Sequence, residues 1–96
     1  MSKVYWVSTY KSVSDQIALA AYAQLASPAM AAHGGVFLAK GNPVQIIESG
    51  MQQRVVLIEF ESWEKALAAY NSDGYQAALK VLGNTAIRDI RIVEAS

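Results

Sequence analysis

The sequence has 96 residues, a length that favours one domain with one hydrophobic core, spanning residues 1–96. Its formal net charge is zero and its lysines and arginines are not clustered, which argues against nucleic-acid binding. Cysteine is absent, which excludes disulfides, thiolate catalysis and thiolate metal sites.

The balance of apolar and charged residues is unusual for a small domain. Hydrophobic residues make up 53% of the chain and charged residues only 17%. Because a small domain has much surface, we expect some apolar area to be covered by another subunit or to line a ligand cavity. Residues 1–12 lack the apolar core of a signal peptide, and no run has the roughly 18–20 apolar residues of a membrane helix. We therefore expect a cytoplasmic protein with no membrane partner.

The first predicted element is a strand over residues 3–10, rich in Val, Tyr, Trp and Thr. Val4, Trp6 and Ser8 fall on one face of this strand, and its other face also carries apolar side chains. We expect both faces to be covered.

An alanine-rich helix is predicted next, over residues 15–33. Its inward-facing stripe is predicted at positions four residues apart: Ile17, Ala21 and Leu25. Pro28 should kink or divide the helix near Ser27, and one residue of Gly34-Gly35 should take a positive φ at its end.

Three strands are predicted in the middle of the chain, over residues 36–40, 44–48 and 53–61, with a turn at residues 41–43. The third is apolar on both faces, which is typical of a strand covered on both sides.

Two helices and a last strand complete the pattern. Ser62 is the predicted N-cap of the first helix, and Ser72 or Asp73 that of the second. The inward stripe of the first helix is predicted at Trp63, Ala66, Leu67 and Tyr70, and that of the second at Tyr75, Ala78, Leu79 and Leu82. The last strand is predicted over residues 87–94.

The predicted order, β-α-β-β-β-α-β, is that of an α+β, ferredoxin-like βαββαβ sandwich with an extra hairpin strand. The helices of one chain cover one face of such a sheet. Because the other face is also apolar, at Val55 and Leu57, we expect a second copy to pack against it. The sequence thus predicts a homodimer with a barrel-like core.

Several short stretches resemble a known family. They are Tyr5-Trp6, His33-Gly34-Gly35, Phe37-Leu38-Ala39-Lys40-Gly41, Arg54-Val55-Val56, Glu59-Phe60, Ala69-Tyr70-Asn71-Ser72, Tyr75-Gln76 and Ile92-Val93-Glu94. In this order they resemble the bacterial domain-of-unknown-function family "thirteen-thirty", of the dimeric α/β-barrel superfamily. The sequence departs from the family pattern at Leu82-Gly83, Gly74 and Lys40. The resemblance implies the fold and the dimer but no activity, since the wider superfamily includes cofactor-free monooxygenases, haem-degrading enzymes and isomerases.

Glu59 is the first catalytic candidate. It lies on the strand face that points away from the helices, into the predicted dimer interior, where a buried carboxylate would suit acid–base chemistry. The alternative is that Glu59 forms an ion pair with Arg54, Arg88 or Arg91, or lies in water at the rim.

His33, the only histidine, is the second catalytic candidate, as an acid–base residue or a haem ligand. The alternative is that it caps the C-terminus of its helix. One histidine and scattered carboxylates form no ligand cluster, so we expect no metal, and we expect no cofactor.

Four further residues are candidates for ligand binding. Arg54 could hold a carboxylate, Tyr75 and Trp6 could line an aromatic pocket, and Ser72 could contribute its hydroxyl group. The alternatives are an ion pair for Arg54, core positions for the aromatic residues and a helix cap for Ser72.

Two classes of function remain open from the sequence. The first is a small-molecule binder or cofactor-free enzyme, of the isomerase or monooxygenase type, that uses a cavity between sheet and helices for a small polar or aromatic ligand. The second is a non-catalytic dimerising or ligand-sensing module.

Overall fold

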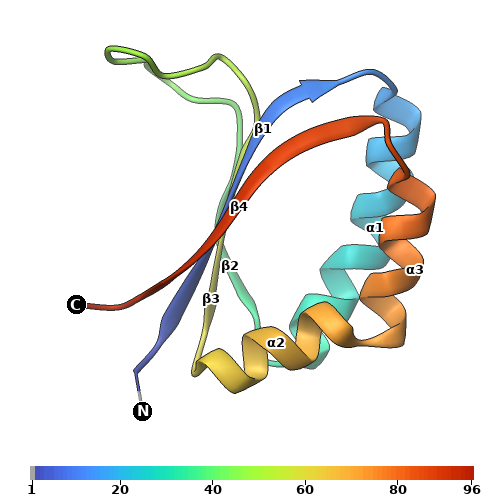
Figure 1. Cartoon of the computed structure of the whole chain (residues 1–96), viewed down its shortest axis with the longest axis vertical. Coiled ribbons are helices and arrows are strands. Elements are labelled where there is room, and N and C mark those ends of the chain that lie inside the picture. The colour runs from blue at the N-terminus through green and yellow to red at the C-terminus, as the bar shows by residue number, and fades with distance from the viewer. Residues whose placement is uncertain (1) are drawn as a thin grey trace.

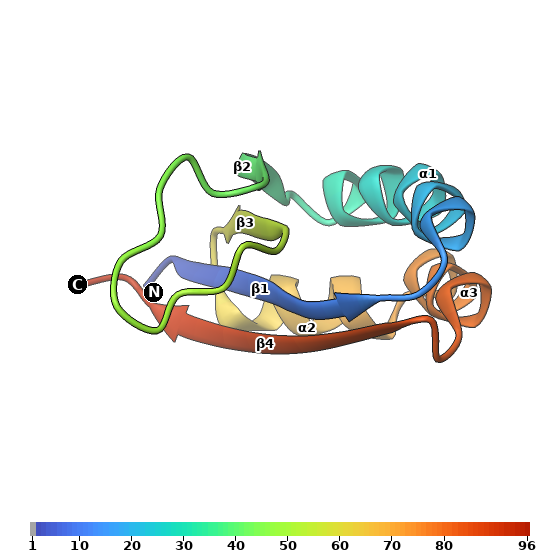
Figure 2. The ribbon, with the colours of Figure 1, turned by 90° about the horizontal axis from the view of Figure 1, so that it is seen from above.

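The computed structural model describes residues 2–96. Over these residues, three helices cover one face of a four-stranded antiparallel sheet (Figures 1 and 2). The elements are β1 (Val4–Val13), α1 (Gln16–Ala32), β2 (Val36–Gly41), β3 (Val55–Phe60), α2 (Trp63–Asn71), α3 (Asp73–Leu82) and β4 (Ala86–Glu94). The strand order is β2-β3-β1-β4. This is the α+β ferredoxin-like fold that the order of the elements predicted.

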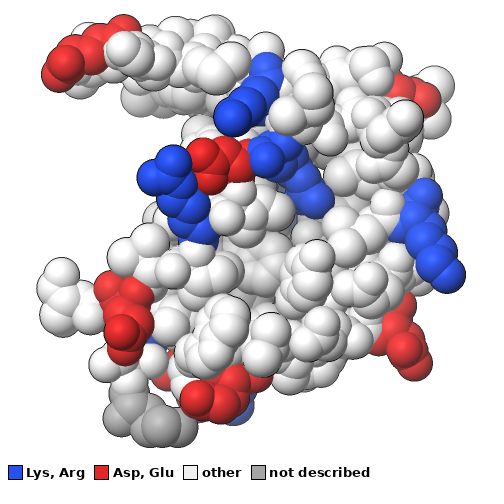
Figure 3. All heavy atoms as spheres, in the orientation of Figure 1, with Lys and Arg blue, Asp and Glu red and all other residues white. Residues whose placement is uncertain are grey.

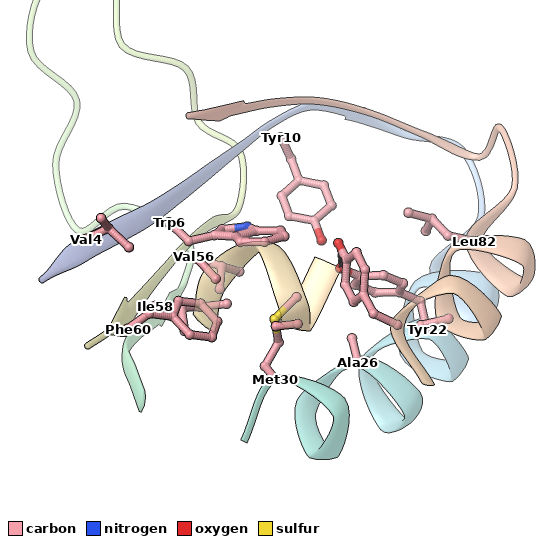
Figure 4. Close-up of a cluster of buried hydrophobic side chains, with 14 residues drawn as sticks. Val4, Trp6, Tyr10, Tyr22, Ala26, Met30, Val56, Ile58, Phe60 and Leu82 are labelled. Carbon is pink, nitrogen blue, oxygen red and sulfur yellow. Dashed lines mark hydrogen bonds between the residues drawn. The ribbon is translucent and has the colours of Figure 1, made fainter. Parts of the chain in front are cut away.

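The central strand β1 pairs with β3 on one side and β4 on the other. Its alternation is as predicted: Val4, Trp6, Ser8 and Tyr10 point toward the helices and are buried, while the residues between them are half-buried. β3 alternates in the same way, with Val56, Ile58 and Phe60 buried under the helices. The core therefore lies between the sheet and the helices (Figure 4).

The hairpin strand predicted over residues 44–48 is wrong. The described chain between β2 and β3 contains no strand, and the segment at residues 42–54 projects from the sheet on the side away from the helices (Figure 1). A strand needs a partner for its backbone groups, and this segment leaves the sheet edge where a partner would lie. Pro43 also lacks the N–H that a sheet ladder requires.

Helix α1 differs from its prediction in two ways. It is not divided at Pro28, which lies on its exposed side, where the loss of one backbone hydrogen bond leaves the helix continuous. Its buried stripe is also displaced by one residue position from the predicted one, so a neighbouring face of the helix is buried. The buried residues are Tyr22, Ala26 and Met30, whereas Ile17 is 83% exposed and Leu25 is 41% exposed.

The two short helices are capped as predicted. Ser62 Oγ accepts a hydrogen bond from the amide of Lys65, and Ser72 Oγ accepts one from the amide of Tyr75. The α3 stripe is as predicted, with Tyr75, Ala78 and Leu82 buried. The α2 stripe is not: this helix buries Ala66 and Ala69, while three of its predicted inward residues, Trp63, Leu67 and Tyr70, are 41–48% exposed.

The sheet face opposite the helices is open and apolar. Half-buried or exposed apolar residues occupy it on every strand: Tyr5, Val7, Val36, Val55, Leu57 and Val93. Apolar side chains of the segment at residues 42–54, including Ile46 and Ile47, border one end of this face. Most of the side seen in Figure 3 is also uncharged. Among the described residues, no helix is long and apolar enough to cross a membrane.

Candidate functional site

The candidate site is a cavity between the sheet and α1. It has a free volume of about 40 Å³. Trp6, Ser8 and Tyr10 of β1 line it from the sheet, and Tyr22 and Met30 line it from α1. Figure 4 shows Tyr10 pointing from β1 toward the helices, and Met30 pointing from α1 toward Trp6.

The strand register brings two arginines to this cavity. Tyr10 lies opposite Arg88 in the β1–β4 pairing, and the Tyr10 amide donates a hydrogen bond to the Arg54 carbonyl at 2.9 Å. Arg54, at the residue before β3, Tyr10 of β1 and Arg88 of β4 therefore form a row across the sheet. Ser8 lies two residues before Tyr10 on the same buried face of β1. All four side chains line the cavity.

Two buried polar atoms in the cavity have no hydrogen-bond partner within residues 2–96. They are Ser8 Oγ and Arg54 Nε. Ser8 is only 2% exposed. Buried polar atoms in native proteins nearly always have a partner, so two unpaired ones in the same cavity mark it as a place where a further group is expected.

Arg88 is held by a network of tyrosines. Its Nη1 donates a hydrogen bond to the Tyr22 hydroxyl at 2.9 Å, and that hydroxyl lies 2.8 Å from the hydroxyl of Tyr75. The Arg88 guanidinium also lies 5.6 Å from the centre of the Tyr10 ring and 5.0 Å from that of Tyr22. These contacts fix the position of the guanidinium beside the cavity.

Burial sets the protonation of the tyrosines. It raises the pKa of Tyr75, and the neighbouring Tyr22 hydroxyl raises it further. Burial also raises the pKa of Tyr10, although Arg88 acts in the opposite direction. Both phenols are therefore neutral at pH 7 and can act as hydrogen-bond donors rather than as bases.

The charge of the cavity lining is entirely positive. Lys40, Arg54 and Arg88 line it, and no carboxylate does so among the described residues. Lys40 Nζ lies 4.8 Å from the centre of the Phe37 ring. The ion pairs formed by the described residues are Lys3–Glu59, Lys65–Glu61 and Arg91–Asp89, so none of them neutralises these three cations.

The two catalytic candidates lie away from the cavity. Glu59 is on the open face of the sheet, as predicted, and its Oε1 accepts a hydrogen bond from Lys3 Nζ at 3.3 Å. Its ion-pair partner is thus none of the three arginines considered from the sequence. His33 is the C-cap of α1, and its Nδ1 lies 3.1 Å from the Ala29 carbonyl oxygen. The two side chains therefore do not meet at one site.

The four ligand-binding candidates divide into two groups. Arg54 and Trp6 line the cavity, and Tyr75 contributes to it indirectly through its hydroxyl contact with Tyr22. Tyr75 is fully buried, and its ring packs edge-on against the Trp6 ring, with the two ring centres 5.6 Å apart. Ser72 lies at the junction of α2 and α3, where its hydroxyl also donates to the Ala69 carbonyl at 2.7 Å.

Sequence reasoning missed Ser8, Tyr10 and Arg88 as site residues. Two of them carried a detectable signal. Ser8 shares the buried face of its strand with Val4 and Trp6, and a polar residue on such a face needs a partner. Arg88 shares the inward face of β4 with Ile90 in the same way. Among the described residues, no three metal-binding side chains gather at one place.

Comparison with known proteins identifies the family. The model of the domain of unknown function DUF1330 matches residues 3–96. The chain therefore belongs to this family, and the resemblance found in its short stretches is confirmed. None of the curated proteins compared with the sequence matches it.

Solved structures share the fold at low sequence identity. A protein of unknown function from Rhodopseudomonas palustris is 17% identical, with a TM-score of 0.74 over 98% of this chain and 81% of that one. A dimeric protein of unknown function with a ferredoxin-like fold, from Bacteroides fragilis, is 14% identical, with a TM-score of 0.67 over 99% and 98%. SnoaB, a cofactor-independent oxygenase from Streptomyces nogalater, is 12% identical, with a TM-score of 0.69 over 99% and 94%.

Proposed function

We propose that this member of the DUF1330 family binds a small organic molecule in the cavity between its sheet and α1, as a homodimer. The observation that carries the proposal is that Ser8 Oγ and Arg54 Nε, both lining this cavity, are buried and unpaired within the described chain. An unpaired buried polar group costs about 1–3 kcal/mol, and a bound ligand would offset that cost by completing the hydrogen bonds.

The lining favours binding over acid–base catalysis. Acid–base catalysis, such as an isomerisation by proton transfer, needs a positioned side chain that removes a proton. The described lining residues include no carboxylate and no imidazole, and the pKa of Tyr10 is raised by burial. Glu59, the predicted base, lies on the other face of the sheet in contact with Lys3. Among the described lining residues, no carboxylate or imidazole is therefore placed to act as such a base.

The homodimer is supported by the open sheet face. Its apolar residues are left half-exposed by the described chain, and a second copy packed face to face would remove them from water. The projecting segment at residues 42–54 would then extend beside the partner, where Val44 and Ile47, at 105% and 71% exposure, could be covered. The related fold from Bacteroides fragilis is described as dimeric.

Binding is tested by filling the cavity. Ala23 lines it from α1, so Ala23→Leu should occupy the free volume while keeping a helix-forming residue. Ala20→Leu, on the exposed side of the same helix, is the matched control. In a thermal-shift screen of small carboxylates and phenols, compounds that raise the melting temperature of the natural protein and of Ala20→Leu should have no effect on Ala23→Leu. A screen without any stabilising compound, or an unchanged response of Ala23→Leu, would contradict the proposal.

The dimer is tested by its mass in solution. Light scattering at micromolar concentration should give twice the chain mass of 10.4 kDa. Leu57→Glu, on the open face, should give a monomer, whereas Ile17→Glu, on the exposed side of α1, should leave the dimer intact. A monomer mass for the natural protein would refute the dimer. A dimer that binds no ligand would instead support a purely dimerising module.

A further inference from the structure

The polar part of the cavity identifies a ligand class. Resting on the proposed function, we infer that the ligand is a small monocarboxylate whose carboxylate group accepts hydrogen bonds from Ser8 Oγ and Arg54 Nε, with its short apolar part against Trp6 and Met30.

The strand register brings the two hydrogen-bond donors, Ser8 and Arg54, close enough together to bind the same ligand group. Ser8 lies opposite Val56 in the β1–β3 pairing, and Arg54 lies two residues before Val56 on the same chain. The two residues are thus diagonal neighbours on one sheet face, about 7–8 Å apart in an antiparallel pair. Both side chains line the same cavity, so one carboxylate group bound there can accept a hydrogen bond from each. A guanidinium and a hydroxyl group are both donors to carboxylate oxygens.

The charge of the cavity selects an anion. Lys40, Arg54 and Arg88 line the cavity, and none of them forms an ion pair with a carboxylate among residues 2–96. Arg88 is already bound to the Tyr22 hydroxyl at 2.9 Å, so it contributes a fixed charge, while Arg54 Nε has a free N–H. In a partly buried space such charges act more strongly than in water, because solvent screens them less.

The free volume selects the size of the anion. The cavity offers about 40 Å³. One water molecule needs about 10–15 Å³ measured in this way, so the space holds about three water molecules, or a small organic anion whose bonded atoms lie closer together than separate waters do. This limits the ligand to a short chain, but size alone does not separate a short carboxylate from a phosphate ion, which has as many heavy atoms as propionate. The rest of the lining beside Ser8 and Arg54 is mostly apolar, including Trp6, Met30 and Ile58, which suits a short hydrocarbon chain (Figure 4).

The experiment compares an acid with its neutral counterpart. Propionate and propionamide have nearly the same shape but differ in charge, and inorganic phosphate is an anion with as many heavy atoms as propionate but no apolar part. Binding of each is measured by titration followed by ¹H–¹⁵N NMR in a buffer without chloride, at pH 7 and constant ionic strength. We expect propionate to bind at least ten-fold more tightly than propionamide and than phosphate, with the largest shifts at the amides next to Ser8 and Arg54.

Three variants assign the effect to the cavity. Arg54→Gln removes the charge and should weaken propionate binding at least ten-fold, whereas Ser8→Ala removes one hydrogen bond and should weaken it several-fold. Lys80→Gln removes an exposed cation of α3 and should change the affinity less than two-fold. The NMR spectrum of each variant reports its fold, and Ser8→Ala tests the proposal on its own if Arg54→Gln does not fold.

Each contrary outcome has a separate meaning. If propionamide binds as tightly as propionate, the anion inference is overturned and binding in the cavity stands. If phosphate binds more tightly than propionate, the argument from the apolar lining is overturned. If both folded variants bind propionate as the natural protein does, the assigned donors are wrong. If none of the three compounds binds, this inference fails, and the proposed function fails with it only if the wider screen of carboxylates and phenols is also negative.

Discussion

Replacing Ser8 by alanine should make the ligand-free protein more stable. The Ser8 hydroxyl is buried, at 2% exposure, and has no partner in the described chain. An unpaired buried hydroxyl costs about 1–3 kcal/mol, and its removal leaves only a small void. We expect Ser8→Ala to raise the free energy of unfolding by about 1 kcal/mol, which for a domain of this size raises the melting temperature by about 4–8 °C. The same variant should bind its ligand more weakly.

Ser62→Ala is the matched control, because Ser62 is also buried, at 7% exposure, but its hydroxyl group has a hydrogen-bond partner. Ser62 Oγ accepts a hydrogen bond from the amide of Lys65 at the start of α2. The same substitution should therefore lower the free energy of unfolding by about 1 kcal/mol. Urea unfolding at one fixed protein concentration measures both variants. If Ser8→Ala destabilises the protein as much as Ser62→Ala does, the Ser8 hydroxyl has a structural partner and the reasoning is refuted.

Three other residues give further predictions. Tyr22→Phe should lower the free energy of unfolding by about 2–4 kcal/mol, because Arg88 and Tyr75 both lose a hydrogen-bond partner. Tyr75→Phe should lower it by only about 1 kcal/mol, and equal losses in urea unfolding would contradict the hydrogen-bond network of Arg88, Tyr22 and Tyr75. Burial raises the pKa of Tyr75, so above about pH 10 the folded state keeps a proton that the unfolded state loses. The free energy of unfolding should therefore fall as the pH rises above about 10, and it should fall less steeply in Tyr75→Phe. Ser72→Ala should lower the free energy of unfolding by about 1 kcal/mol in thermal unfolding, because the Ser72 hydroxyl forms hydrogen bonds at the junction of α2 and α3. The same variant should bind ligand with unchanged affinity, and a loss of affinity would make Ser72 a ligand-binding residue again.

The sheet was predictable from the sequence because its pattern is strong. Two-residue alternation in β1 and β3 fixed which side chains face the helices, and it placed Glu59 on the opposite face. The absence of a strand over residues 44–48 was not predictable, because a short apolar stretch looks the same in sequence whether or not a neighbouring strand exists to pair with it. In this protein the same residues form a projecting segment instead.

Helix faces were harder to predict, for a reason that lies in composition. Helix α1 has alanine or another apolar residue on nearly every side, so the stripe at Tyr22, Ala26 and Met30 competes in sequence with the one at Ile17, Ala21 and Leu25. Only the tertiary contact of the Tyr22 hydroxyl with Tyr75 and Arg88 distinguishes the two stripes, and that contact joins residues 53 and 66 positions apart.

The residues of the candidate site were also only partly predictable, because they meet through tertiary structure. Arg54 and Trp6 were predicted as ligand-binding residues, and both line the cavity. Arg88 and Ser8 were not, because their importance depends on the β1–β3 and β1–β4 registers, which bring them beside Arg54. A sequence indicates which side chains are polar and inward, but only the register shows which of them share a cavity.

A crystal structure of the protein with propionate tests the central claim most directly. The account predicts electron density for the ligand between the sheet and α1, with carboxylate oxygens within hydrogen-bond distance of Ser8 Oγ and Arg54 Nε and the hydrocarbon part against Trp6. Ligand density on the open sheet face beside Glu59, with the cavity holding only protein atoms or water, would contradict it.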